Sequence, residues 1–480
     1  MKSKISRIME DHALERVPEG ERHSWLKISW NTVGLITTLV ILFFGAVVCF
    51  VAGVKIALLA GVVSFAIGGS LGWAMARVAV ETGYSSTLIT RQYGLGLRGS
   101  ALASVIFGFL ILGFLAIENG LLYRGFLFFL NLEDGWTARI ALYGAMTVAW
   151  VLLTAFGFAV VTRTSSLMIV GFLIVLAWMM FVVISGVAEA PAAALLFGSQ
   201  LEPAVLSGMG IHSEADKFIF AVNLLVGPAC ALALNTADFG RYGKSAGHVA
   251  AAAMIAIFFQ SLLMMLVGGL LMKSAAPAMV NYFTEVAGMA PEAARRQVLQ
   301  SPDSIAATFM VFGGPVGFLL MILAQAKAQV LNTYSSSLCI ANLFDALFRW
   351  RPGRIAFVVL ANVIALVMLY GEILHFVEEW IKLLGVLLSA LATTIILDYY
   401  IVSRRGVVSR RVAGDARDSA GPGAPEPVNW AGVIAILGAV VCAHWLFRPY
   451  QPIEVLTSIA CVAVIYLPLR LTVLRPRERV

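Results

Sequence analysis

The sequence predicts an all-α membrane protein that crosses the bilayer about twelve times. Apolar residues (AVILMFWYC) make up 60% of the 480 residues, whereas charged residues (DEKR) make up 13%. The mean hydropathy is +0.89, and the apolar residues occur in runs of about 18 or more, the length of a membrane-spanning helix. Short basic or Gly- and Pro-containing segments separate these runs. This composition excludes a soluble enzyme, a disordered chain and a disulfide-stapled secreted domain.

Each apolar run predicts one helix. The twelve helices are expected at residues 27–50, 54–80, 100–123, 137–161, 166–187, 217–239, 247–272, 315–343, 355–371, 377–402, 429–447 and 452–471. A short amphipathic segment at 302–312 is expected on the surface before the eighth helix.

The charged segments divide the chain further. The expected parts are an N-terminal segment at 1–26, a ten-helix core at 27–402, a flexible Gly- and Pro-rich loop at 403–428, two C-terminal helices at 429–471 and a tail at 472–480.

The basic residues set the expected orientation. The chain has 34 Lys and Arg against 27 Asp and Glu, a net charge of +7, and most of the basic residues fall in loops on the side of the N-terminus. Both termini are therefore expected in the cytoplasm and the chain in the inner cell membrane. The sequence contains no basic stripe with interleaved aromatic residues, so no nucleic acid partner is expected. The sequence contains no CxxC pair, Walker motif, GxSxG or HExxH, so no metal, cofactor or enzyme activity is expected.

Two of the expected helices contain residues that interrupt a helix. Gly227 and Pro228 lie near the middle of the sixth helix, where proline removes a backbone hydrogen bond and glycine permits unusual dihedral angles. A simple proline kink is the alternative. The first helix has a weaker version, in which Gly34 precedes Thr37 and Thr38. These two helices open two five-helix halves, the pattern of a five-plus-five inverted-repeat secondary transporter with discontinuous helices 1 and 6 and a midplane substrate site.

Four motifs give the chain a family resemblance. They are NTADFGRYGK (Asn235–Lys244), TGYSSTLITRQYGLGLRGS (Thr82–Ser100), LNTYSSSLCIANLF (Leu331–Phe344) and ILDYYIVSRR (Ile396–Arg405). In this order and spacing the chain resembles the nucleobase–cation symporter-1 family of cytosine, purine, hydantoin and allantoin permeases, with a pattern nearest that of the cytosine permeases. The resemblance implies the five-plus-five fold, two extra C-terminal helices and solute uptake coupled to sodium or protons.

Glu118 is the first candidate for substrate binding. It follows a long apolar run in the third helix, where an ionised carboxylate costs about 3 kcal/mol, so it is expected to face a cavity or a partner. The resemblance implies that Phe114 is the aromatic platform for a heterocycle and that Glu118, one turn later on the same face, hydrogen-bonds it. Relatives typically have Trp and an amide or small residue there. The alternative is a carboxylate near the helix end that reaches water or pairs with Arg124.

Other candidate binding residues lie on the sixth and eighth helices. The resemblance implies that Gln329 binds the base through its amide, followed by Asn332 and Thr333, and that Gly227–Ala229 form an unwound segment beside the base. Relatives often have an aromatic residue in this segment. Ala229 supplies no ring, which leaves room for a bulkier or non-planar ligand.

Lys327 is the candidate for ion coupling. The resemblance implies that sodium-coupled relatives take cation ligands from the eighth helix and from the broken first helix, here Gly34, Thr37 and Thr38. Lys327 stands where a Ser or Thr ligand is expected. Its ammonium group would occupy the space and charge of a bound cation, which favours proton-coupled or sodium-independent transport. The alternatives are a structural pair with Glu118 and a lysine at a helix end.

Together these features predict a secondary-active permease that imports a nucleobase-like nitrogen heterocycle (purine, pyrimidine, allantoin or hydantoin type) by alternating access. The expected partners are a small-molecule substrate, the lipid bilayer and a proton rather than sodium. Two alternatives stay open: the same fold transporting a cationic or amine-bearing solute, and a membrane sensor that binds without transporting.

Overall fold

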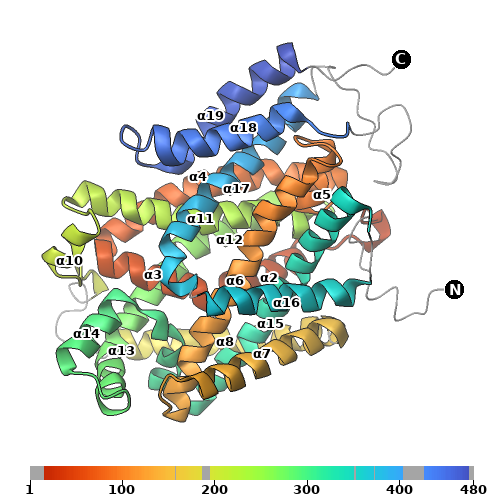
Figure 1. Ribbon diagram of the computed structural model, residues 1–480. Coiled ribbons are helices and arrows are strands. Elements are labelled where there is room, and N and C mark those ends of the chain that lie inside the picture. The colour runs from red at the N-terminus through yellow and green to blue at the C-terminus, as the bar shows by residue number, and fades with distance from the viewer. Residues whose placement is uncertain are drawn as a thin grey trace.

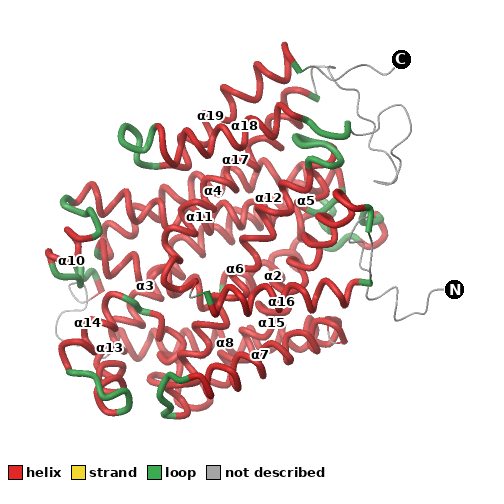
Figure 2. Tube along the Cα trace, in the orientation of Figure 1, coloured by secondary structure: helices red, strands yellow, loops and turns green. Residues whose placement is uncertain are grey.

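The computed structural model describes residues 16–156, 158–185, 195–350, 353–371, 373–403 and 426–474. Over these residues it is built from helices and connecting loops without a strand (Figures 1 and 2). Among the described residues, eight helices are long and apolar enough to cross a membrane, and four shorter apolar helices accompany them. The expectation of an all-α polytopic membrane protein is confirmed.

The first five spans occupy the N-terminal half. Their helices are α2 (Trp25–Ile36), α3 (Leu39–Ala52), α4 (Val54–Thr82), α6 (Ser100–Leu130), α7 (Trp136–Phe156) and α8 (Phe158–Ser185). The short helices η1 (Glu19–Glu21) and α5 (Ser86–Gln92) precede α2 and α6.

The next five spans lie between residues 214 and 402. Their helices are α11 (Glu214–Gly240), α12 (Ala246–Phe258), the π-helix η2 (Phe259–Met264), α13 (Met265–Glu285), α15 (Thr308–Phe348), α16 (Arg354–Tyr370), α17 (Val377–Leu397) and the π-helix η5 (Asp398–Val402). Short connecting helices are α10 (Pro203–Gly208), α14 (Pro291–Gln300), η3 (Asp303–Ala307) and η4 (Ile373–Phe376). The chain ends with α18 (Trp430–Val441), η6 (Cys442–Leu446), α19 (Glu454–Pro468) and η7 (Leu469–Val473).

The first span is discontinuous, as expected. The helix α2 ends at Ile36 and α3 begins at Leu39, while Thr38 between them is extended, with φ −110° and ψ 155°. Gly34 lies inside α2, before the break. The interruption therefore falls on the two threonines, and it leaves the first backbone N–H groups of α3 without partners in their own helix.

The sixth span is continuous, so the expected break at Gly227–Pro228 is wrong. Both residues lie inside α11, and Pro228 is accommodated as a proline within the helix. Gly227 serves close packing instead: a Cβ there would lie 2.7 Å from the carbonyl oxygen of Ile381, and one on Gly385 would lie 3.2 Å from the Gly227 Cα. The two glycines let α11 and α17 approach backbone to backbone.

Several helix limits differ from expectation. The seventh span continues through the π-helix to Glu285, and α8 begins at Phe158, before the expected residue 166. The segment 302–312 divides between η3 and the first turn of α15, and α15 bends at Gly314, where φ is 58°. Residues 404–425 of the expected flexible loop, 1–15 of the N-terminal segment and 475–480 of the tail lie outside the described residues.

The spans pack as two groups. In the bundle group (α2, α3, α4, α11, α12 and α13), α4 lies along α11 and α12, and α3 lies along α13. In the scaffold group (α6, α7, α8, α15 and α16), α15 packs against α6, α8 and α16. The first span thus contacts the seventh and the sixth contacts the second, a reciprocal pairing that fits two related halves. The helix α17 packs on α11, and α18 and α19 lie outside it (Figure 1).

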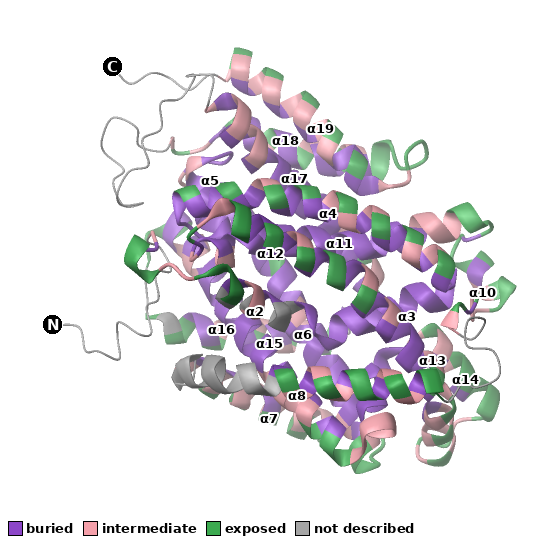
Figure 3. Cartoon of the chain, turned by 180° about the vertical axis from the view of Figure 1, so that it is seen from behind, coloured by how far each residue is buried: buried purple, intermediate pink, exposed green. Residues whose placement is uncertain are grey.

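The distribution of buried residues fits a protein in lipid. Buried residues concentrate along α6 and α11 in the middle of the molecule, whereas exposed residues line outer faces such as that of α8 (Figure 3). Large apolar side chains on these outer faces, including Trp73, Trp178 and Val464, are more than half exposed. Apolar surface of this extent is expected where helices contact acyl chains.

Candidate functional site

A small cavity lies beside the break in the first span, between the bundle and scaffold groups. Its volume is about 30 Å³, and it is lined by Thr38, Val40, Ile41, Ile111, Phe114, Glu118, Pro228, Ala231, Leu232, Asn235, Gln260, Ala328 and Asn332. Five of these residues are candidates from the sequence: Thr38, Phe114, Glu118, Pro228 and Asn332. The volume holds about two water molecules and is far below the several hundred Å³ typical of a ligand site. In this conformation the cavity offers only water-sized space.

Glu118 joins the third span to the broken first span. Its side chain is 1% exposed, and Oε1 accepts a hydrogen bond from the backbone N–H of Val40 at 3.3 Å. With its amide oriented to satisfy both partners, Gln325 donates to Glu118 Oε2 (2.7 Å) and accepts from the backbone N–H of Leu39 (3.1 Å). The carboxylate therefore caps α3, whose N-terminus favours negative charge.

The alternative in which Glu118 pairs with Arg124 is wrong. Arg124 pairs instead with Asp134, at 2.9 Å, and with Asp303, at 3.2 Å, at the end of α6 beyond Glu118. The cost of burying the Glu118 carboxylate is thus offset by N–H donors of a helix end and not by a guanidinium group.

Phe114 contributes an aromatic ring to the cavity wall and packs against a second aromatic residue behind it. Phe114 meets Trp380 of α17 edge to face, with ring centroids 5.5 Å apart. Gly113 permits this approach, because a Cβ there would lie 2.1 Å from the indole ring. The expected aromatic platform is therefore a Phe that is backed by a Trp from another helix.

Gln329 lies behind the cavity wall. It is fully buried, and its Nε2 donates to Asn119 Oδ1 at 2.7 Å and to the Leu115 carbonyl at 3.1 Å. Trp150 Nε1 donates to the same Asn119 oxygen at 2.8 Å. The Gln329 oxygen accepts from Asn332 Nδ2 at 3.3 Å, so Gln329 holds the residue that does line the cavity.

Three further candidates also point elsewhere. Thr333 accepts from Asn362 of α16 at 3.5 Å. Gly227 packs on α17, as described above, and Ala229 packs on α4, where a Cβ on Gly68 would lie 2.6 Å from the Ala229 Cβ. Of the expected Gly227–Ala229 segment, only Pro228 lines the cavity.

Lys327 is buried in the interior of α15, with 3% of its side chain exposed. The alternative of a lysine at a helix end is therefore wrong. Among the residues that the structure describes, no carboxylate lies within 4.0 Å of its ammonium group, so the alternative pair with Glu118 does not form. The helix α15 contacts α2, and its Gln325 accepts from the backbone N–H of Leu39 in α3, so the eighth span lies beside both sides of the break.

The sequence did not single out several polar groups at the site. Asn119 and Trp380 support it, and Gln260 and Asn235 line it. Asn235 stands in one of the recognised motifs, and Gln260 is a lone amide in an apolar run. Neither residue type nor position in the sequence indicates that these two side chains line a cavity, because this depends on tertiary packing.

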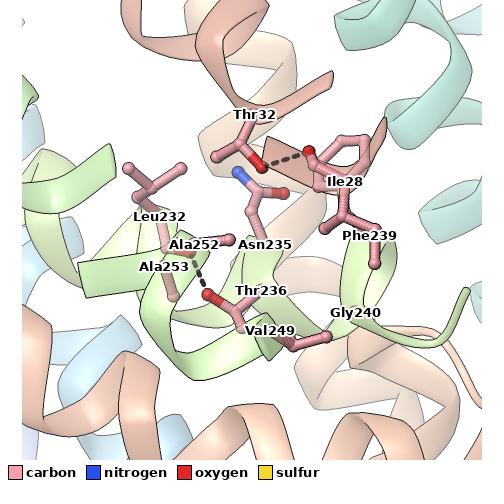
Figure 4. Close-up of a pocket in the computed structure, with 10 residues that line it drawn as sticks. All are labelled: Ile28, Thr32, Leu232, Asn235, Thr236, Phe239, Gly240, Val249, Ala252 and Ala253. Carbon is pink, nitrogen blue, oxygen red and sulfur yellow. Dashed lines mark hydrogen bonds between the residues drawn. The ribbon is translucent and has the colours of Figure 1, made fainter. Parts of the chain in front are cut away.

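A second, smaller cavity lies next to the first. Its volume is about 10 Å³, and it lies between α2, α11 and α12, with Leu232 and Asn235 lining both cavities. Figure 4 shows the Asn235 amide directed toward Thr32, while the hydroxyls of Thr32 and Thr236 donate to the carbonyls of Ile28 and Leu232 within their own helices (2.9 and 3.0 Å). Leu232 and Asn235 thus separate two small spaces aligned along α11.

A family model described as permease for cytosine/purines, uracil, thiamine and allantoin matches residues 18–466. The chain belongs to this family. The permease is accordingly a membrane transporter and not an enzyme, and its family is one of secondary transporters for nucleobase-like substrates. No curated protein sequence matches it significantly.

Solved structures agree on the fold. The inward-facing conformation of Mhp1 matches with a TM-score of 0.70 and 15% identity, over 96% of this chain and 93% of that chain. Mhp1, a nucleobase-cation-symport-1 family transporter, in a closed conformation with bromovinylhydantoin bound, matches with a TM-score of 0.63 and 15% identity, over 96% and 95%. A Na⁺-coupled sialic acid symporter in an outward-open state matches with 0.52 and 12% identity, over 99% and 94%.

Proposed function

We propose that the permease imports a neutral nucleobase-like nitrogen heterocycle of the purine, pyrimidine, allantoin or hydantoin type. It works by alternating access in the inner membrane, with both termini in the cytoplasm, and it does not require sodium. The cavity between the bundle and scaffold groups is the binding site, and it opens alternately to the two sides as the groups move.

The observation that carries this proposal is the position and lining of the cavity. It lies at the break of the first span, where inverted-repeat transporters bind their substrates. One wall comes from the scaffold group (Phe114, Glu118 and Asn332) and the other from the bundle group, including Thr38 and Pro228. A ring is held by an aromatic face and by amide groups that match its N–H and C=O edges.

The hydrogen bonds of Glu118 argue for a neutral solute. A cationic or amine-bearing solute would need a carboxylate free to pair with it. The Glu118 carboxylate is already engaged by the Val40 N–H and by Gln325. Binding an ammonium group would compete with the cap of α3, so a neutral ring is the better fit.

Lys327 supports independence from sodium. Its buried ammonium group lies in α15, the helix that contacts both α2 and α6 around the break. The C-terminal end of α2 presents backbone carbonyls without partners in their helix, which favour a cation. On this proposal the Lys327 ammonium group lies near these carbonyls and supplies the charge that a bound sodium ion would otherwise supply.

Uptake measurements test the proposal. Cells that express the permease are given labelled uracil, cytosine, hypoxanthine, allantoin, hydantoin and a polyamine, and accumulation is compared with that of cells carrying an empty vector. Concentrative uptake of at least one heterocycle is expected. Accumulation of the polyamine alone would show a cation carrier, and binding by the purified protein without accumulation would show a sensor.

A further inference from the structure

Gln260 is a buried amide in the cavity wall with an unused donor. Its side chain is 5% exposed and lines the cavity beside the break. Among the residues that the structure describes, its Nε2 has no hydrogen-bond partner. Leaving a buried donor unpaired costs stability, and folded proteins rarely do so without a reason.

The backbone holds Gln260 in an unusual turn. The residue lies in the π-helix η2 between α12 and α13, and π-helical turns occur frequently at functional sites. The neighbouring α4 packs tightly against this turn, because a Cβ on Gly61 would lie 2.4 Å from the carbonyl oxygen of Ser261. The extra residue of the π turn changes which side chain faces the cavity, and packing against Gly61 fixes that choice.

Other polar groups of the cavity already have hydrogen-bond partners within the protein. Glu118 is occupied by the end of α3 and by Gln325, and the Asn332 amide nitrogen donates to Gln329. The Thr38 hydroxyl interacts with the Glu118 carboxylate, whereas Gln260 Nε2 has no partner within the described part of the chain. The Gln260 amide therefore offers a hydrogen-bond donor from the bundle side, and it matches a ligand that presents an acceptor there.

We propose that Gln260 is a substrate-contacting residue that sets specificity by donating a hydrogen bond to a ring carbonyl oxygen. The ligand class is a cyclic amide, imide or ureide, in which a carbonyl and a ring N–H are adjacent. This inference rests on the proposed function and adds to it a chemical requirement at one edge of the ring. A site built to hydrogen-bond a substrate group discriminates strongly against analogues that lack it.

Binding to the purified permease tests the role of Gln260. Dissociation constants are measured for uracil and hydantoin, and then for the two analogues of the better ligand that each lack one of its two carbonyl groups. The variants are Gln260→Met, which keeps the length but removes both hydrogen-bonding groups, and the control Ser261→Ala. Ser261 lies in the same π turn, and its buried hydroxyl also lacks a partner among the described residues, but it does not line the cavity.

The expected result is a coupling between residue and carbonyl. In the native permease, removal of one particular carbonyl weakens binding about tenfold to a hundredfold. Gln260→Met binds the parent dione more weakly by a similar factor, and removal of that carbonyl from the ligand has little further effect on its affinity for the variant. Ser261→Ala retains the native pattern within about twofold.

The outcomes separate this inference from the proposed function. If Gln260→Met binds the dione as the native permease does, or if both carbonyl losses stay fully additive with the substitution, the role of Gln260 is wrong and the heterocycle function stands. If Gln260→Met does not fold, Gln260→Asn and Gln260→Glu are measured in the same way, with folding checked by thermal unfolding. If the native permease binds neither dione nor any other heterocycle of the uptake panel, the proposed function fails and this inference fails with it.

Discussion

The Glu118 carboxylate accepts a hydrogen bond from the backbone N–H of Val40, at 3.3 Å, and thereby links the scaffold group to the bundle group. In transporters with broken helices, the free N-terminus of a half-helix points at anionic groups of the substrate. Here a side chain of the protein fills that place. Any motion of one group against the other must keep or break this contact, so Glu118 is placed to influence both binding and the change of conformation.

The first prediction concerns Glu118→Gln. The amide retains one acceptor oxygen but loses the charge, and its NH₂ group would face a donor, either the Val40 N–H or Gln325. The loss of a hydrogen bond to a charged group costs about 1–3 kcal/mol. We expect uptake to fall at least tenfold or the order of preferred solutes to change, as measured by initial rates of labelled uptake.

The control for this prediction is Glu133→Gln, because Glu133 lies exposed in the loop after α6. It should transport like the native permease at equal surface expression. Unchanged kinetics in Glu118→Gln would remove Glu118 from the binding site and from the conformational change alike.

The second prediction concerns sodium. If the Lys327 ammonium group stands in for a bound cation, uptake in choline medium should equal uptake in sodium medium. The measurement is the initial rate in the two media at fixed pH and ionic strength. A strict requirement for sodium would refute the proposal that the Lys327 ammonium group takes the place of a bound sodium ion.

The third prediction concerns the proton gradient. A sodium-independent permease that concentrates its solute needs another driving force, and a proton is the remaining candidate. Dissipation of the gradient with a protonophore should slow accumulation and lower the final ratio of internal to external solute. Indifference to the protonophore would favour facilitated diffusion.

The fourth prediction concerns the stability of the cytoplasmic-facing end of the scaffold group, on the proposed topology. Arg91 of α5 pairs with Asp345 of α15 at 2.8 Å, and both side chains are buried. Removing one partner of such a pair strands the other charge and typically costs 3–5 kcal/mol. Arg91→Ala should lower the thermal unfolding temperature in detergent markedly, whereas Arg77→Ala, at a half-exposed side chain, should change it little. Equal melting temperatures would contradict a stabilising role.

Hydropathy predicted the class of fold and most spans because burial in lipid requires long apolar runs. The residues Gly34, Thr37 and Thr38 predicted the break in the first span correctly, whereas Gly227–Pro228 wrongly predicted a break in the sixth. The pair Gly227–Pro228 has the same sequence signature whether it unwinds a helix or lets α17 approach closely. Only the position of Gly385 on the neighbouring helix decides between the two, and a sequence does not show which helices are neighbours.

The candidate site was predictable one residue at a time, but not as a set of contacts. A carboxylate in an apolar run must have a partner, so Glu118 was recognisable. Its partner is the backbone of α3, which has no side-chain signature at all. The depth of Gln329 behind Asn332, and the entry of Gln260 into the cavity through a π turn, depend on helix rotation that periodicity does not resolve.

The last prediction separates Gln329 from Asn332. Asn332 lines the cavity, whereas Gln329 holds it through the bond from Asn332 Nδ2 and is itself held by Asn119. Asn332→Ala should weaken binding directly. Gln329→Ala should raise KM by about twofold to tenfold, the range of one neutral hydrogen bond, with a smaller change in the maximal rate. Because both act through the same amide, the double variant should bind little worse than Asn332→Ala alone. Fully additive losses would instead show that Gln329 contacts the substrate on its own.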